Sequence, residues 1–111
     1  MTSVIPSYAT TAYAAAQTQN QSPTQILVQL YDFAIAGCVA KDERKSRAAL
    51  VELIAALDFN YEEIAGGLYR LYDFSLREVK AGRFDNALPI LRGLRETWEQ
   101  ALSGAPVAVG T

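Results

Sequence analysis

The sequence contains no histidine and a single cysteine, and both shortages exclude whole classes of functional site. Without histidine the chain cannot form a Ser-His-Asp or Cys-His catalytic arrangement or an imidazole metal site. With Cys38 alone it cannot form an internal disulfide, a CxxC motif or a metal site of several thiolates. We therefore expect a protein that is not an enzyme and holds no cofactor or metal, with Cys38 as a small buried apolar residue.

Charge is missing from one part of the chain, because residues 1–31 contain no Asp, Glu, Lys or Arg. Residues 1–21 also lack the basic start and continuous apolar run of a secretory signal. No segment approaches the ~18 apolar residues of a membrane helix. The whole chain has a net charge of −2, without the basic stripe that binds nucleic acids or anionic membranes. We expect a cytoplasmic protein with no membrane span and no nucleic-acid partner.

The rest of the chain carries apolar residues at helical spacing, and no stretch alternates as a half-buried strand does. The predicted helices run from about 22 to 40, from 42 or 46 to 57, from 60 to 82 and from 85 or 86 to 102. Their short connections favour antiparallel neighbours. The predicted fold class is therefore all-α: an antiparallel up-down four-helix bundle over residues 22–102. A flexible uncharged N-terminal arm over 1–21 and a flexible C-terminal tail over 103–111 complete the chain.

Capping residues mark several of the predicted helix ends. Ser22 and Gln25 have the spacing of a capping box at the start of the first helix. Asn60, with Glu63 three residues later, predicts the start of the third helix in the same way. Gly82 is placed to end that helix, because glycine readily adopts the left-handed conformation found there.

Two details interrupt the helical pattern. Gly66-Gly67, inside the third helix, costs roughly 1 kcal/mol per glycine against alanine. The pair predicts close approach of another helix or, alternatively, a flexible joint. Pro89 falls near the first turn of the fourth helix, where a missing N–H is tolerated at one position and costs a hydrogen bond at the next.

The first predicted helix has more apolar surface than one buried face needs. Residues 26–40 contain only two polar side chains, Gln29 and Asp32. This pattern fits either a central helix covered on several sides or a surface that awaits a partner. Val51 and Ala55 widen the apolar face of the second helix in the same way. The excess predicts a protein-binding surface.

The tetrapeptide Leu-Tyr-Asp-Phe occurs twice, at residues 30–33 and 71–74. We expect Leu and Tyr of each copy to face the core and Asp to face solvent, so that the two copies form matched layers. Asp32 and Asp73 could be considered as a carboxylate pair for acid–base chemistry. No other titratable group lies near them in sequence, which favours solvated or helix-bonded roles.

In this repeat and its surroundings the chain resembles the FliS-type flagellin export chaperones. The matching fragments follow the family's order over about residues 13–102, although each is weak alone. They are Tyr13, Ser22-Pro23, Leu30-Tyr31-Asp32-Phe33-Ala34-Ile35, Leu57-Asp58, Ile64-Ala65, Leu68, Leu71-Tyr72-Asp73-Phe74, and Leu94-Arg95 with Trp98. The stretches from the first Leu-Tyr-Asp to residue 58 and from 71 to 98 are shorter than usual. Gly66-Gly67 also replaces a pair that is usually polar, so the chain resembles a shortened member.

The resemblance implies a bacterial cytoplasmic chaperone that binds the C-terminal segment of flagellin, prevents its premature polymerisation and assists its export by the flagellar export machinery. Flagellin's amphipathic helices would lie in an apolar groove. The expected groove residues are Val51, Ile54, Leu68 and Tyr72. The spacing of the last three fits a core position equally well. Residues of the arm expected to cover the groove in the free protein are Ile5, Tyr8 and Tyr13.

Two other functions fit the same apolar excess. One is an adaptor or structural bundle that binds a different amphipathic helix, such as a filament-cap or anti-sigma partner. The other is a homodimer that buries its own surface. Under the chaperone hypothesis we expect a monomer or weak homo-oligomer when the protein is free.

Overall fold

The structure, a computed structural model, describes residues 22–103 and contains four helices there. They are α2 (Pro23–Val39), α3 (Glu43–Ala55), α4 (Glu62–Lys80) and α5 (Phe84–Leu102). No strand occurs within this described range. The predicted all-α four-helix bundle is confirmed. The expected N-terminal arm with Ile5, Tyr8 and Tyr13, and the tail beyond 103, lie outside the described residues.

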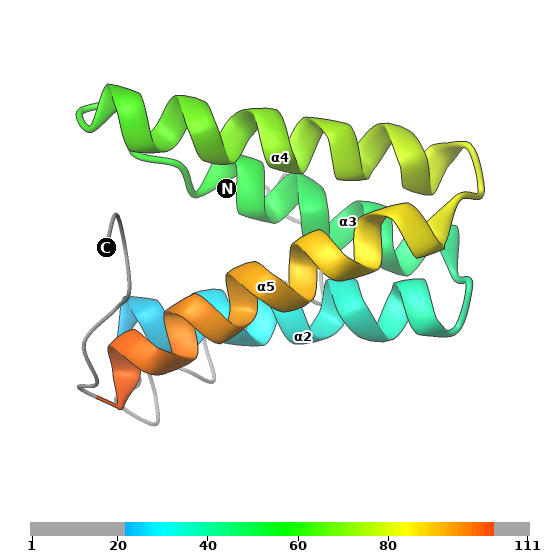
Figure 1. Cartoon of the computed structure of the whole chain (residues 1–111), viewed down its shortest axis with the longest axis horizontal. Helices are drawn as coiled ribbons and strands as arrows, with labels where there is room; N and C mark the ends of the chain where they lie inside the picture. The colour runs from blue at the N-terminus through cyan, green and yellow to red at the C-terminus, as the bar shows by residue number, and fades with distance from the viewer. Residues whose placement is uncertain (1–21, 104–111) are drawn as a thin grey trace, which may run out of the picture.

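The helices form a closed ring in which every helix packs against two others. α2 packs against α3 and α5, and α4 packs against the same two helices. Figure 1 shows the α2–α3 and α4–α5 connections at one end of the bundle, which we name the turn end. The α3–α4 connection, residues 56–61, lies at the opposite end, which we name the loop end. This is the predicted up-down arrangement.

The core lies along the axis of this ring and draws side chains from all four helices. Its largest fully buried side chains include Tyr31 of α2, Leu50 and Leu53 of α3, Tyr72 of α4 and Leu91 of α5. Burying a side chain of this size contributes roughly 1.5–3 kcal/mol to folding. Within the described residues, the core therefore draws on all four helices.

Helix α2 is not a central helix. It has two neighbours, as α4 does, and its buried positions cover only the side facing them. Asp32 and Val39 lie on the outer side, where Val39 is 58% exposed. The apolar residues of α2 therefore exceed what the described bundle buries.

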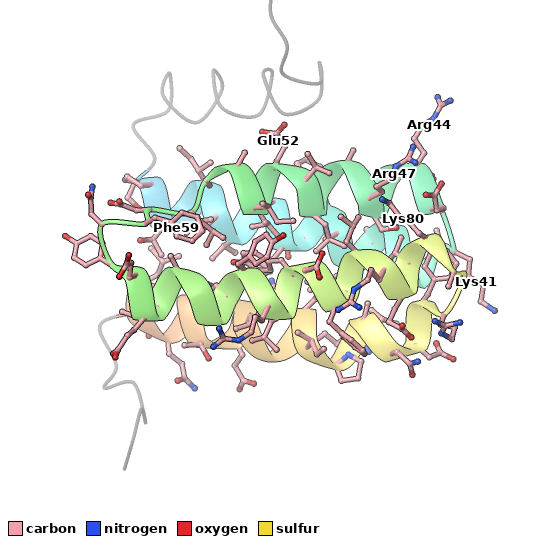
Figure 2. The ribbon with its side chains drawn as sticks, turned by 90° about the horizontal axis from the view of Figure 1, so that it is seen from above. Lys41, Arg44, Arg47, Glu52, Phe59 and Lys80 are labelled. Atoms are coloured by element: carbon pink, nitrogen blue, oxygen red, sulfur yellow. The ribbon has the colours of Figure 1, made fainter. Side chains whose placement is uncertain are left out.

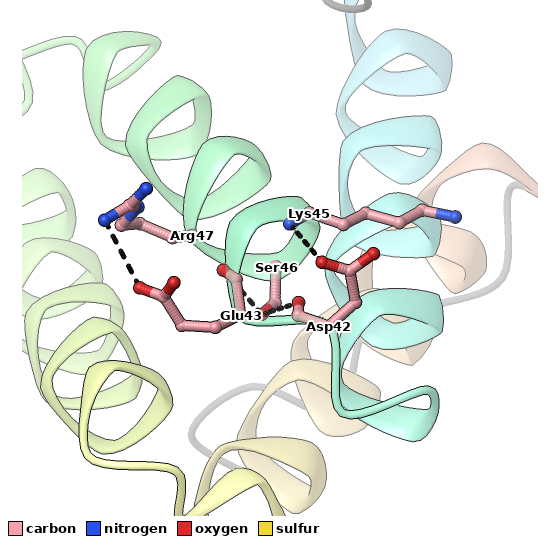
Figure 3. Close-up of polar contacts among 5 residues, drawn as sticks. All are labelled: Asp42, Glu43, Lys45, Ser46 and Arg47. Atoms are coloured by element: carbon pink, nitrogen blue, oxygen red, sulfur yellow. Dashed lines mark hydrogen bonds and ion pairs between the residues drawn. The ribbon is translucent and has the colours of Figure 1, made fainter.

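Local hydrogen bonds explain where the first two helices begin. Ser22 Oγ accepts from the Gln25 amide at 3.2 Å, and Gln25 Oε1 accepts from the Ser22 amide at 2.7 Å, which confirms the capping box. Asp42 caps α3, because its Oδ1 accepts from the Lys45 amide at 3.1 Å (Figure 3). Ser46 Oγ donates back to the Asp42 carbonyl at 2.8 Å and ties the turn to the helix.

The starts of the other two helices differ from the prediction. Asn60 does not cap α4: the cap position is Tyr61, without a side-chain hydrogen bond. The Asn60 amide instead donates to Asp58 Oδ1 at 3.0 Å, an Asx turn that ends the connection before the helix starts. α5 starts at Phe84, so Pro89 lies in the second turn rather than the first. There its missing N–H removes one bond of the helical ladder.

The two connections at the turn end have the same backbone geometry. After α4, the Arg83 amide donates to the Glu78 carbonyl at 2.8 Å and the Gly82 amide to the Val79 carbonyl at 3.0 Å, which is a Schellman motif. After α2, the same two backbone hydrogen bonds form, with Lys41 at the position that Gly82 occupies after α4. Gly82 has φ 79° and Lys41 has φ 55°, so both occupy the left-handed region. Gly82 suits that conformation, as predicted, whereas Lys41 is strained in it.

Close approach of two helices depends on Gly37 and not on the predicted pair Gly66-Gly67. A Cβ added at Gly37 would lie 2.6 Å from the Ser46 backbone nitrogen of α3. A Cβ at Gly66 or Gly67 would meet only the tip of the Arg70 side chain, at 3.8 and 4.0 Å. The packing of the described helices therefore requires glycine at position 37 and leaves both glycines of α4 unexplained.

Candidate protein-binding surface

The two copies of Leu-Tyr-Asp-Phe meet through their tyrosines in the core. The hydroxyls of Tyr31 and Tyr72 are hydrogen-bonded to each other, and Trp98 Nε1 donates to the Tyr31 hydroxyl at 3.1 Å. Burial raises the pKa of both tyrosines, because an ionised phenolate would be poorly solvated there. This arrangement confirms the expected position of the tyrosines. It also corrects the expectation that Tyr72 lines a groove, since its side chain is 1% exposed and inaccessible to a ligand.

The fragment Leu94-Arg95 with Trp98 lies at the level of Tyr31 and Tyr72 in the bundle. Arg95 of α5 forms an ion pair with Asp32 of α2, the residue that follows Tyr31. Arg95 Nε lies 2.6 Å from Asp32 Oδ1. Asp73 pairs with Arg77 at 3.2 Å within α4. The two aspartates therefore form separate ion pairs: Asp73 has a helix-bonded role as predicted, whereas the pair that Asp32 forms between two helices was not predicted. Tyr31, Asp32, Tyr72, Arg95 and Trp98, which belong to these fragments, therefore join the helices of the bundle to one another.

The other expected groove residues differ in exposure. Val51 is 45% exposed on α3 and available to a partner. Ile54 and Leu68 are half-buried and packed against the core. Of the four residues predicted to line the groove, Val51 alone lies on a fully open surface.

A second apolar surface runs along the outside of α4 and was not predicted. It consists of Ile64, Gly67, Leu71 and Phe74, and we name it the α4 stripe. Ile64 is 65% exposed, Leu71 39% and Phe74 38%. The residues are spaced by three, four and three positions, so they share one helix face. Leu71 was expected to face the core together with Tyr72, and that expectation is wrong.

The α4 stripe lies beside the core-facing residues of the same helix, which include Ala65, Leu68, Tyr72 and Ser75. The two sets have the same spacing and are offset by one residue, so α4 has a wider apolar face than its two neighbours cover. The sequence shows that the two sets are offset by one residue, but it does not show how much of the α4 surface the neighbouring helices cover. The sequence therefore could not show which of the two sets is buried.

Aromatic side chains extend the apolar surface to the loop end. Phe59, labelled at the loop end in Figure 2, is 54% exposed, and Tyr61, the cap residue of α4, is 66% exposed. Together with Ile64 they place three large apolar side chains in the space of six residues. Exposed apolar groups gathered in this way commonly mark a protein-binding surface.

Charged residues border one side of the α4 stripe. Glu63, Arg70 and Arg77 recur every seven residues along α4, and all three are exposed. Glu63 and Arg70 each directly precede a residue of the α4 stripe, Ile64 and Leu71. Glu63 lies at the loop end of α4, Arg70 near its middle and Arg77 toward the turn end. An apolar stripe with a charged border is the usual surface of a helix that packs against another amphipathic helix.

Other kinds of site are not found in the part of the chain that the structure describes. Cys38 is buried, and burial raises the pKa of its thiol, which disfavours the reactive thiolate. Within residues 22–103 no three potential metal ligands gather, and no helix is both long and apolar enough to span a bilayer. Comparison with known proteins adds no relative: no family model, curated protein or solved structure matches the chain.

Proposed function

We propose that the protein is a bacterial cytoplasmic chaperone of flagellar export, which binds the C-terminal segment of flagellin and prevents its premature polymerisation. The observation that carries the proposal is the α4 stripe, an open apolar surface on a bundle whose core is already closed. The ordered sequence fragments that resemble the FliS-type chaperones support flagellin as the client. Delivery to the flagellar export machinery would follow from the same resemblance.

The shape of the α4 stripe suits an amphipathic helix as the client. From Ile64 to Phe74 the stripe is about 15 Å long, since a helix rises 1.5 Å per residue. That length receives about three turns of a ligand helix. Gly67 lies within the stripe, where the absence of a side chain lets a ligand backbone come close to α4. This gives Gly67 a role that packing within the bundle does not provide.

The charges beside the stripe indicate how the client is oriented. Acidic residues of the ligand would lie near Arg70 and Arg77, and basic residues near Glu63. Arg77 is already paired with Asp73, so Arg70 is the better partner. Exposed ion pairs of this kind contribute at most about 1 kcal/mol each, so they select an orientation while the apolar contacts supply the affinity.

Charging the stripe tests the proposal. Ile64→Glu, and separately Phe74→Glu, should weaken binding of a flagellin C-terminal peptide at least tenfold in isothermal titration calorimetry. Both positions are exposed in the free protein, so circular dichroism should show unchanged helical content. Val39→Glu is the matched control: Val39 is equally apolar and exposed but lies on α2, away from the stripe. It should bind like the wild type.

Three outcomes separate the alternatives. Peptide binding that survives both stripe variants but is lost in Val51→Glu moves the site from α4 to α3. A wild type that does not bind the flagellin peptide contradicts the flagellin proposal and leaves an adaptor for another helix. Light scattering that finds a stable dimer, dissociated by Ile64→Glu, shows instead that the stripe is buried against a second copy.

A further inference from the structure

A group of basic side chains lies at the turn end, outside the surface proposed for the client. It consists of Lys41 in the α2–α3 turn, Arg44 and Arg47 in α3, and Lys80 at the end of α4, and we name it the basic corner. Figure 2 shows all four labelled side chains at this end of the molecule, with Lys41 at its outer edge and apart from the other three. All four residues are exposed. Lys41, Arg44 and Arg47 lie within seven residues of the sequence, and the fold brings Lys80 of α4 to the same end of the bundle.

Most of the charge in the basic corner is not neutralised within the protein. Arg47 pairs with Glu43 at 3.3 Å, and both side chains are exposed. For Lys41, Arg44 and Lys80 there is no ion pair among the described residues. The nearest acids in sequence are already engaged: Asp42 caps α3 and Glu43 holds Arg47 (Figure 3).

The basic corner belongs to a separation of charge along the whole bundle. Residues 41–47 and 73–85, which include both turns, hold seven of the ten cationic side chains and five of the twelve acidic ones. The remaining residues hold three cationic and seven acidic side chains. A protein that is acidic overall therefore presents a basic end, where the field of the corner is not cancelled by its surroundings.

Lys41 provides a second, independent observation. It stands at a left-handed position, φ 55°, where a glycine would be free of strain. The matching position of the other turn is Gly82, so the chain uses glycine in one of the two equivalent turns. Backbone strain of this kind gathers at functional sites, so the strain at Lys41 points to a role for its side chain.

We propose that the basic corner docks an acidic segment of a partner protein. Four cations on one small corner match a short run of Asp or Glu, and charge complementarity favours fast, salt-sensitive association. Nucleic acid and anionic membrane fit less well, because the chain is acidic overall and its acidic residues dominate the rest of the surface. The proposal does not depend on the client bound at the α4 stripe.

The test uses a fluorescein-labelled oligoglutamate peptide and the full chain in a fluorescence anisotropy titration at low salt. The wild type should bind the peptide at low salt, and its affinity for the peptide should fall as the salt concentration rises. The triple variant Lys41→Gly, Arg44→Gln, Lys80→Gln should bind roughly tenfold more weakly, because three exposed ion pairs are lost. Arg92→Gln is the control, since Arg92 is exposed on α5 outside the corner, and it should bind like the wild type.

The single variant Lys41→Gly guards against loss of folding as an explanation. It should weaken peptide binding while raising the melting temperature, so affinity and stability move in opposite directions. The flagellin peptide should bind all of these variants equally, which keeps this result separate from the client site. Oligoglutamate binding that is absent, or unchanged in the triple variant, overturns the proposal. Corner-dependent binding to phosphatidylserine vesicles or duplex DNA, without binding to oligoglutamate, overturns it as well.

Discussion

Tyr31 and Tyr72 occupy the same place in two copies of one tetrapeptide, and their hydroxyls share a hydrogen bond in the core. Trp98 donates to the Tyr31 oxygen, so Tyr31 is the centre of the group. Buried polar atoms in an apolar core are costly when they lose a partner. The three residues therefore fix the relative positions of α2, α4 and α5 more strictly than apolar contacts of similar size would.

Replacing each tyrosine by phenylalanine should show that Tyr31 contributes more to stability than Tyr72. Tyr31→Phe leaves both the Trp98 N–H and the Tyr72 hydroxyl without their partner and should lower the free energy of unfolding by about 1–3 kcal/mol. Tyr72→Phe removes one hydrogen bond and should cost about 1 kcal/mol. Urea unfolding followed by circular dichroism measures both values. A larger loss for Tyr72→Phe would contradict the central role of Tyr31.

Lys41 and Gly82 allow a paired test at single positions. Lys41→Gly should stabilise the protein by about 0.5–1 kcal/mol, because relief of left-handed strain exceeds the added chain entropy. Gly82→Ala should destabilise it by about 1 kcal/mol, since alanine adopts that conformation poorly. Thermal unfolding gives the comparison, and changes of equal sign in the two variants would contradict it.

At the level of helices, the spacing between α2 and α3 depends on Gly37, whereas Gly66 and Gly67 contact nothing that requires glycine. Gly37→Ala should therefore cost about 1–3 kcal/mol, since its Cβ would overlap the backbone of Ser46. Gly66→Ala should stabilise the protein by up to about 1 kcal/mol. Gly67→Ala should stabilise it similarly but weaken client binding. Chemical denaturation of the three variants, with calorimetry for the last, separates the roles of these glycines.

The turn between α4 and α5 is held by Glu78, which is nearly buried. Its carboxylate accepts from Arg83 Nε at 2.8 Å and from Asn86 Nδ2 at 2.7 Å. These hydrogen bonds, with the positive charge of Arg83, lower the pKa of Glu78 to about 2. Asn86 was predicted to open α5, and its bond to Glu78 shows a tertiary role instead.

A lowered pKa makes this turn sensitive to acid. In the unfolded chain Glu78 takes up a proton near its ordinary pKa of about 4.3, whereas the folded form resists until about pH 2. The stabilisation is present above pH 5 and is lost as the pH falls toward 2. Glu78→Gln should lower the melting temperature at pH 7 and flatten its decline between pH 5 and pH 2. An unchanged pH profile would show that the turn does not depend on this charge.

For the whole molecule, the fold followed from the sequence because local signals agreed with one another. Apolar spacing, the Ser22 capping box and short connections each depend on neighbouring residues alone. One error arose within a connection, and another where a second helix decides the outcome. Asn60 lost its capping role to the turn at Asp58, and the glycine at close approach was Gly37.

The binding surface was harder to predict than the fold for the same reason. Val51 could be recognised as an extra apolar position, but Tyr72 was assigned to a groove although it belongs to the core. Leu71 was expected to face the core although it lies on the outside of α4. Helical spacing identifies which residues share a face of a helix. It does not show which part of that face the neighbouring helix buries.

The closed ring of helices has a consequence for the order of the chain. Gln25 at the start of α2 and Leu102 at the end of α5 line one shallow depression, so the two ends of the bundle are neighbours. A short linker from residue 103 to residue 22 would make the bundle a continuous loop, which could be reopened between residues 56 and 61. This circular permutant would make the α2–α5 contact local in sequence and the smaller α3–α4 contact remote, and on this balance it should fold faster than the natural order.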